Sequence, residues 1–254
     1  MVDRYFVDEP IAGTQATLRG SEAHHLMHVM RAKPGEVVSL FDGSGAEYLA
    51  RVAEVTRERV GLEIVERREL DREAPVRVTL AVALPKGDRQ RWLAEKAVEL
   101  GVWRLIALES SRSISKPSDG ALERLRRAVI EASKQCGRNR LMEIATAKWS
   151  MFLNLVPSSA TRYIAHPAAA TPPQMPTSQP AAAPLVSSDS DQAQVEIVVA
   201  IGPEGGFTEA ELAEAVSRGW QPLNLGPRVL RVETAAVAAA TLAGLGCLAS
   251  PGES

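Results

Sequence analysis

Short apolar runs separated by turn residues fill the N-terminal part of the chain, from Met1 to about Glu73. The runs at 37–41, 48–52 and 60–65 have the length of strands, and the turn at 42–45 reads Asp-Gly-Ser-Gly. This pattern is typical of a small β-barrel or sandwich. One helix is predicted over 21–31, where Ser21 can cap the first turn. The charged stretch 67–75 ends in proline and is interpreted as a linker.

Strands alternate with helices from residue 76 onward. The near-continuous apolar run 76–84 predicts a strand that is buried on both faces. Thr208 and Glu211 have the spacing of a capping box, which predicts the start of a helix that ends at Gly219. The remaining elements are expected as helices over 88–100, 121–135 and 234–248 and as strands over 104–108, 162–165, 195–201 and 222–225. This alternation predicts a parallel sheet with helices on both faces.

The pattern therefore predicts an α/β chain with two domains: residues 1–73 form a smaller β domain, and residues 74–254 form the α/β domain. Residues 167–191 break the alternation, because proline, alanine and serine dominate them and no periodicity is visible. Such a composition buries too little surface to offset the entropy of ordering. We interpret this segment as a flexible surface insertion between two strands.

Charge is distributed unevenly along the chain. The formal net charge is −2, but residues 74–150 hold 15 Lys and Arg against 8 Asp and Glu. The segments on either side are both acidic, with 10 against 14 before it and 4 against 9 after it. A localised basic surface can attract phosphates even on an acidic protein, and solvated helix faces are the alternative explanation.

Several classes of protein are disfavoured by what the sequence lacks. It has no run of about 18 uninterrupted apolar residues, so no membrane span is expected. The first residues carry acids and no apolar signal core, and Cys136 and Cys247 suggest no disulfide framework, so we expect a cytoplasmic protein with free thiols. His24, His25 and His28 share one helix without a fourth ligand, so no metal site is expected.

The first motif with chemical potential is the segment 201–208, Ile-Gly-Pro-Glu-Gly-Gly-Phe-Thr. It follows a strong strand and precedes the capped helix. Three glycines leave the backbone bare, so that a ligand can approach the peptide groups closely. In an open α/β sheet, ligands bind at the carboxyl ends of strands, where this loop is expected. An ordinary strand-to-helix turn is the alternative, but it needs one glycine rather than three.

The second motif is the segment 223–235, Leu-Asn-Leu-Gly-Pro-Arg-Val-Leu-Arg-Val-Glu-Thr-Ala. It also joins a strand to a helix, with Gly226 and Pro227 as the turn. The alternative is a helix cap with two surface arginines, Arg228 and Arg231. Two unusual loops at strand ends of one sheet favour a shared ligand site. The dinucleotide fingerprint, the P-loop and the nucleophile elbow are all missing from the sequence.

With these motifs the chain resembles the RsmE family, the ribosomal small-subunit RNA (uracil-N3)-methyltransferases of the SPOUT superfamily. The resemblance covers nearly the whole length and is carried chiefly by the two loops. Weaker matches are His24-His25-Leu26 through Arg31, Lys86, 95–96, 99–102, 110–113, Glu131-Ala132 with Gln135 and Arg138. The chain departs from the family pattern at 110–113, where Ser-Ser-Arg-Ser replaces Ser-Glu-Arg-Ser, and at 134–136, which reads Lys-Gln-Cys.

The resemblance implies a PUA-like β-barrel that binds RNA and an α/β domain with a trefoil knot, a feature nearly absent from other folds. It implies that S-adenosylmethionine is the cofactor, that the chain forms a homodimer, and that the product is N3-methyluridine in small-subunit (16S) ribosomal RNA, as naked RNA or in the 30S subunit. The cofactor-binding residues that it implies are Gly202, Pro203, Glu204, Gly205, Gly206, Leu223, Leu225, Gly226, Leu230, Arg231 and Thr234.

The reaction requires uracil N3 to lose its proton. Arg138 and Arg231 are our candidates for stabilising the resulting anion, and Glu204 and Glu233 are candidates for the general base, although each carboxylate can instead hold a loop together. Phe207, Tyr5 and Trp103 are candidates for stacking on an unstacked base. The expected RNA-binding residues are His25, Arg31, Lys86, Arg112, Lys134 and Arg138.

Two alternatives remain open at this point. The chain can be a methyltransferase of the same superfamily that acts on a ribose 2′-hydroxyl or another base, which the type of N-terminal domain discriminates. It can also be a non-catalytic RNA-binding factor in ribosome assembly, which would not need the two loops to bind a cofactor.

Overall fold

The computed structural model describes residues 3–113, 117–167 and 195–248, so the expected insertion at 167–191 lies outside the described residues except for Pro167. The chain divides into two compact units. The first contains Met1–Glu73 together with Ile130–Leu141, and the second contains Ala74–Val129 and Met142–Ser254. A short segment from far along the sequence therefore belongs to the N-terminal β unit.

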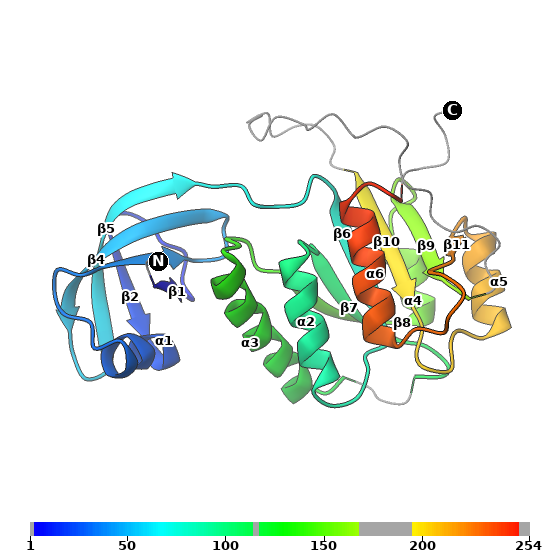
Figure 1. The fold of residues 1–254 in the computed structure, drawn as a ribbon, viewed down its shortest axis with the longest axis horizontal. Coiled ribbons are helices and arrows are strands. Elements are labelled where there is room, and N and C mark those ends of the chain that lie inside the picture. Colours follow the sequence, from blue (N-terminus) through cyan, green and yellow to red (C-terminus); the bar gives the residue numbers. More distant parts are fainter. Residues whose placement is uncertain (1–2, 114–116, 168–194, 249–254) are drawn as a thin grey trace. The chain divides into compact units, whose positions relative to one another are not determined.

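The first unit is built on a five-stranded sheet with the order β1-β3-β4-β5-β2. Figure 1 labels β1, β2, β4 and β5 of this sheet. Strand β1 runs parallel to β3, and the other pairs are antiparallel. Alternate side chains of the strands pack on one core that includes Leu18, Leu40 and Val52. The strands are β1 (Arg4–Phe6), β2 (Gln15–Arg19), β3 (Val37–Phe41), β4 (Ala46–Val55) and β5 (Arg59–Glu69).

The helical stretch of this unit differs from the expected capped α-helix. It consists of a short α1 (Gly20–His24) followed by a π-helical turn η1 (His25–Val29). The N-cap residue is Arg19 and not Ser21, and no side chain caps the helix. The stretch ends before Arg31, whose φ of 56° lies in the left-handed region. Strand β5 extends to Glu69, so the expected linker begins later than the charge pattern suggested.

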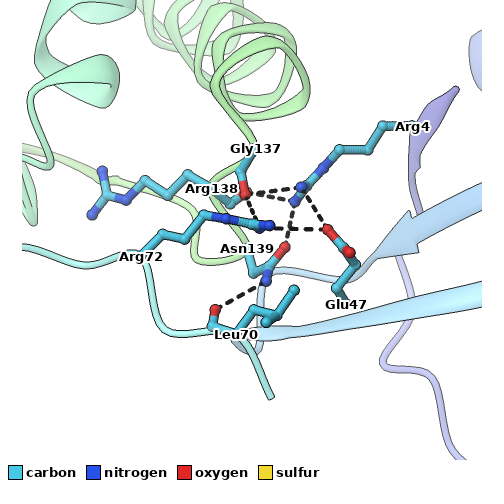
Figure 2. Close-up of polar contacts among 7 residues, drawn as sticks. All are labelled: Arg4, Glu47, Leu70, Arg72, Gly137, Arg138 and Asn139. Carbon is cyan, nitrogen blue, oxygen red and sulfur yellow. Dashed lines mark hydrogen bonds and ion pairs between the residues drawn. The ribbon is translucent and has the colours of Figure 1, made fainter. Parts of the chain in front are cut away.

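Segment 130–141 contains the last turns of α3 (Asp119–Cys136). Two arginines from the N-terminal part of the β unit bind the backbone just after this helix. Arg4 and Arg72 both donate to the carbonyl oxygen of Gly137, at 2.8 and 2.7 Å (Figure 2). Arg4 also pairs with Glu47 at 3.1 Å and bonds Asn139. The last carbonyls of a helix have no partner within the helix, so cationic side chains there are stabilising. The arginines thus fix the C-terminus of α3.

The second unit is a six-stranded sheet in the order β11-β9-β10-β6-β7-β8, and every neighbouring pair is parallel. The expected parallel α/β architecture is confirmed. The strands are β6 (Arg77–Val82), β7 (Arg104–Glu109), β8 (Glu143–Lys148), β9 (Thr161–Ala165), β10 (Glu196–Ile201) and β11 (Gln221–Leu223). The helices are α2 (Arg89–Glu99), the first part of α3, α4 (Trp149–Leu155), α5 (Glu209–Ser217) and α6 (Val232–Gly244).

Both faces of this sheet are covered. Ala81, Val198 and Ala200 project toward a cluster with Trp149 and Phe152 of α4, which α5 also joins. Their neighbours in the strands project to the opposite face, because side chains alternate along a strand. There α6 packs on β6 and β10, and α2 lies beside α6 (Figure 1). Burial on both faces explains why β6 and β10 read as continuous apolar runs.

Candidate functional site

A pocket of about 350 Å³ opens at the carboxyl ends of three neighbouring strands, β9, β10 and β11. Its size lies within the usual range for small-molecule sites. The two glycine-containing loops that the sequence singled out form its walls, as expected for an open α/β sheet. The lining residues from these loops are Ile201–Phe207, Leu223, Leu225, Gly226, Arg228, Val229, Leu230 and Val232.

The first loop needs glycine at two positions. Gly206 has a φ of 67°, in the left-handed region, and its N–H donates to the carbonyl oxygen of Pro203 at 2.7 Å. A Cβ atom at Gly202 would lie 3.1 Å from the backbone nitrogen and from Cδ2 of Phe207. Phe207 itself is buried and packs on Trp149 at 4.8 Å between ring centroids. The loop therefore folds back tightly and is anchored in the core.

The capping box after this loop is confirmed and has a further partner. Glu211 accepts hydrogen bonds from the backbone N–H of Thr208 at 2.8 Å and from the backbone N–H of Ser111 at 2.8 Å. Its side chain is buried. Burial alone would raise the pKa of the Glu211 carboxyl, but the hydrogen bonds from Ser111 and Thr208 outweigh burial and hold that pKa below its usual value.

Arg112 braces the same loop from the segment after β7. Its Nη1 atom donates to the carbonyl oxygen of Gly205 at 2.7 Å and to that of Phe207 at 3.3 Å. Arg112 also lines the pocket. Arg112 is one of the residues that the sequence predicts to bind RNA, and in the structure it contacts the candidate cofactor loop.

The second loop has the same tight character. The Asn224 side chain accepts the N–H of Gly226 at 2.8 Å, and Gly226 has a φ of 108°. Leu223, Leu225 and Leu230 supply apolar wall. Arg231 is the N-cap residue of α6, and neither Arg231 nor Thr234 is among the lining residues. Nine of the eleven predicted cofactor residues therefore meet in one pocket, and the other two lie beside it in the chain.

Arg138 is placed differently from what the sequence analysis expected. Its side chain is 3% exposed, and its Nε donates to Glu73 at 2.8 Å within the β unit. Removal of either partner of such a buried pair would leave an uncompensated charge and destabilise the segment that holds it. The structure thus gives Arg138 a structural role, and Arg231 remains the candidate for stabilising a substrate anion.

The other predicted RNA-binding residues are distributed over both units. His25 and Arg31 are exposed in the β unit, and Lys86 is exposed in the connection between β6 and α2. Lys134 is largely buried and pairs with Glu22 at 2.8 Å. Burial lowers the pKa of Lys134, but the hydrogen bond to Glu22 outweighs burial and raises it overall. Lys134 therefore has a structural partner already.

Two of the three aromatic candidates for stacking on a base are buried in the structure. Tyr5 is 0% exposed, and Phe207 is 5% exposed in the core beneath the loop. Trp103 is half-buried and is covered by Arg77, whose Cζ lies 4.5 Å from the ring centroid. His166, which is not among the residues predicted from the sequence, also lines the pocket. Its position directly after the predicted strand 162–165 was the available signal.

Within the described residues, no group of three or more His, Cys, Asp or Glu side chains is arranged to hold a metal ion. Over the same ranges, no helix is both long and apolar enough to cross a membrane. Cys136 is exposed and Cys247 is buried, and these two cysteines form no disulfide.

Comparison with known proteins defines the class. Residues 72–244 match the family model of an RNA methyltransferase domain, and residues 18–65 match that of an RNA methyltransferase PUA domain. Ribosomal RNA small subunit methyltransferase E from Synechocystis is 32% identical over 228 residues, which are 89% of this chain and 72% of that protein. The chain belongs to the family of ribosomal RNA small subunit methyltransferase E.

Solved structures of relatives show the same fold. The ribosomal RNA small subunit methyltransferase E of Neisseria gonorrhoeae, bound to S-adenosylmethionine, is 31% identical with a TM-score of 0.81, and the match covers 98% of both chains. A Legionella pneumophila methyltransferase in complex with S-adenosylmethionine is 28% identical with a TM-score of 0.79, covering 97% of both chains.

Proposed function

We propose that this chain transfers a methyl group from S-adenosylmethionine to N3 of a uridine in small-subunit (16S) ribosomal RNA. The observation that carries the proposal is the pocket at the ends of β9, β10 and β11, whose walls are the two loops with glycine-dependent backbones. Membership of the methyltransferase E family and the cofactor in two solved relatives support it.

The pocket fits the cofactor on its own geometry. Leucines of the second loop offer apolar surface to a flat purine ring, and the glycines of the first loop offer bare peptide groups that a ligand can approach. The residues that would hold it are Gly202, Pro203, Glu204, Gly205, Gly206, Leu223, Leu225, Gly226 and Leu230. When bound, S-adenosylmethionine supplies an electrophilic methyl group.

The chain's own residues must prepare the uracil. Its N3–H is a weak acid, so a carboxylate in reach can take the proton as N3 becomes the nucleophile. Glu204 lines the pocket and its side chain is 43% exposed, whereas the Glu233 side chain is 9% exposed and is not a lining residue. This contrast favours Glu204 as the base and a structural role for Glu233. Arg231 would stabilise negative charge on the uracil oxygens.

RNA is recognised, in this proposal, by the β unit together with exposed basic residues such as Arg31 and Lys86. Phosphate contacts of this kind weaken steeply as salt rises. We also propose, from the resemblance to the SPOUT superfamily, that the α/β domain is knotted, that two chains form a homodimer and that the protein acts in the cytoplasm. Domain limits of 1–73 and 74–254 belong to the same proposal.

Transfer of labelled methyl groups to small ribosomal subunits, or to their protein-free RNA, tests the function. We expect incorporation with the wild-type chain and at least about tenfold less with Gly202→Val, whose side chain would collide with the backbone of residues 206–207. Binding of RNA without cofactor binding or transfer would instead identify a non-catalytic assembly factor.

A further inference from the structure

Arg89, the first residue of α2, contacts one acidic residue of each of the two sequence motifs, 201–208 and 223–235, that contribute to the pocket. Its Nη2 lies 3.5 Å from Oε1 of Glu204 in the first loop, and its Nη1 lies 3.6 Å from Oε2 of Glu233 at the start of α6. Glu204 and Glu233 are 29 positions apart in the sequence. A single guanidinium therefore joins the two loops, and we refer to these two ion pairs as the Arg89 bridge.

The packing of two helices produces this arrangement. Helix α2 lies beside α6 on one face of the sheet (Figure 1), and Arg89 and Glu233 are both in the first turns of these helices. Neither Arg89 nor Glu233 is among the residues that line the pocket. The bridge thus connects the loops from outside the cavity and leaves the cavity free for a ligand.

Of the two ion pairs in the Arg89 bridge, the pair with Glu233 contributes more to the stability of the loops. Its side chain is 9% exposed, and Oε2 is buried without a hydrogen bond. A buried carboxylate needs compensating positive charge, which here comes from Arg89 and from the N-terminus of α6. Without Arg89, the N-terminus of α6 would be the remaining source of positive charge beside the Glu233 carboxylate. The carboxylate would then be less well compensated, which would favour a shift of the second loop. The pair with Glu204 is more exposed and contributes less.

We propose that Arg89 is a positioning residue that holds the two cofactor loops in their binding geometry before the cofactor arrives. This inference rests on the proposed function, because the ligand that it favours is S-adenosylmethionine. Arg89 acts through Glu204 and Glu233 and contacts neither the cofactor nor the target uracil. Its loss therefore weakens cofactor affinity and raises KM for the cofactor.

The test compares Arg89→Ala with two variants. Arg89→Lys keeps the charge, and Arg91→Ala removes from the same helix a charge that pairs with Glu95. Calorimetry should show cofactor binding about fivefold weaker for Arg89→Ala, partly restored in Arg89→Lys and unchanged in Arg91→Ala. Without cofactor, hydrogen exchange in Arg89→Ala should be faster in peptides covering both 202–207 and 224–233.

Measuring the effect of Arg89→Ala in a chain that also carries Glu233→Gln distinguishes loss of the bridge from general loss of folding. There Arg89→Ala should weaken binding less than in the wild type, because the buried charge that Arg89 compensates is gone. Arg89→Ala that binds the cofactor as tightly as Arg91→Ala, with unchanged exchange in both loops, would overturn the bridge and leave the proposed function intact. A wild-type chain that binds no S-adenosylmethionine would overturn the proposed function itself.

Discussion

The backbone N–H of Ser111 donates to the buried carboxylate of Glu211, 100 residues further along the chain, at 2.8 Å. Glu211 is at the same time the third residue of α5 and the acidic member of its capping box. Together with the bonds from Arg112 to Gly205 and Phe207, this contact ties the end of β7 to the first cofactor loop. The loop is thus braced on the side of β7 as well as through the Arg89 bridge.

Loss of the Glu211 carboxylate should destabilise the α/β unit. In Glu211→Ala the backbone N–H groups of Ser111 and Thr208 lose their acceptor, so the free energy of unfolding should fall by about 1–3 kcal/mol. Denaturant titration followed by circular dichroism measures this change. Glu209→Ala, an exposed acid in the same first turn, is the control and should change stability by less than about 0.5 kcal/mol. Equal effects would contradict the bracing role.

The contribution of Glu211 should also depend on pH. The pKa of its carboxyl is lowered in the folded state, so the stability that it contributes is fully present above the unfolded pKa of about 4.5 and is lost as pH falls through the folded pKa. The difference in unfolding free energy between wild type and Glu211→Gln should therefore shrink as pH is lowered from 7 to 3. A difference that stays constant over this range would show that the charge is irrelevant.

Glycine at position 202 should be required for cofactor binding. In Gly202→Ala the new Cβ would lie 3.1 Å from the backbone nitrogen of Phe207 and 3.2 Å from the backbone carbon of Gly206, so the loop must shift. Affinity for S-adenosylmethionine should fall about tenfold or more, which corresponds to ~1.4 kcal/mol. Gly120→Ala in α3, where the nearest neighbour is the end of a flexible arginine, should bind normally.

Arg112 can be tested for two roles, which are bracing of the first loop and contact with an RNA phosphate. If it braces the loop, Arg112→Ala should weaken cofactor binding several-fold, because two backbone carbonyls lose their donor, and the salt dependence of RNA binding should remain as in wild type. Fluorescence binding titrations at several salt concentrations measure both properties. A reduced salt slope with normal cofactor affinity would instead identify a phosphate contact, as the sequence analysis first suggested.

Local signals made much of the site readable from sequence. The T-x-x-E spacing predicted the capping box of Thr208, and the glycine content of both loops predicted the pocket walls, because each depends on residues within one turn. The long apolar runs of β6 and β10 identified buried parallel strands. Strand β8 was missed because its sequence Glu-Ile-Ala-Thr-Ala-Lys has neither a continuous apolar run nor a regular polar–apolar alternation, and it lies at the edge of the sheet, where it pairs with β7 alone.

Roles that depend on distant partners could not be read in this way. Arg4 precedes its partner Gly137 by 133 positions, and nothing local marks either residue. The sequence around Arg138 indicates an accessible cation, whereas in the structure Arg138 is buried and pairs with Glu73. Arg89 and Glu233 lie 144 positions apart and meet only because α2 packs beside α6. Such pairs follow from tertiary packing, which a single sequence does not specify directly.

The central claim is methylation of uridine N3 in small-subunit ribosomal RNA. The most direct test incubates small ribosomal subunits from cells that lack this protein with the purified chain and S-adenosylmethionine, then digests the RNA and identifies modified nucleosides by mass spectrometry. We predict N3-methyluridine, absent when cofactor is omitted and reduced in Gly202→Ala. A 2′-O-methylated nucleoside, another methylated base or no modification at all would contradict the account.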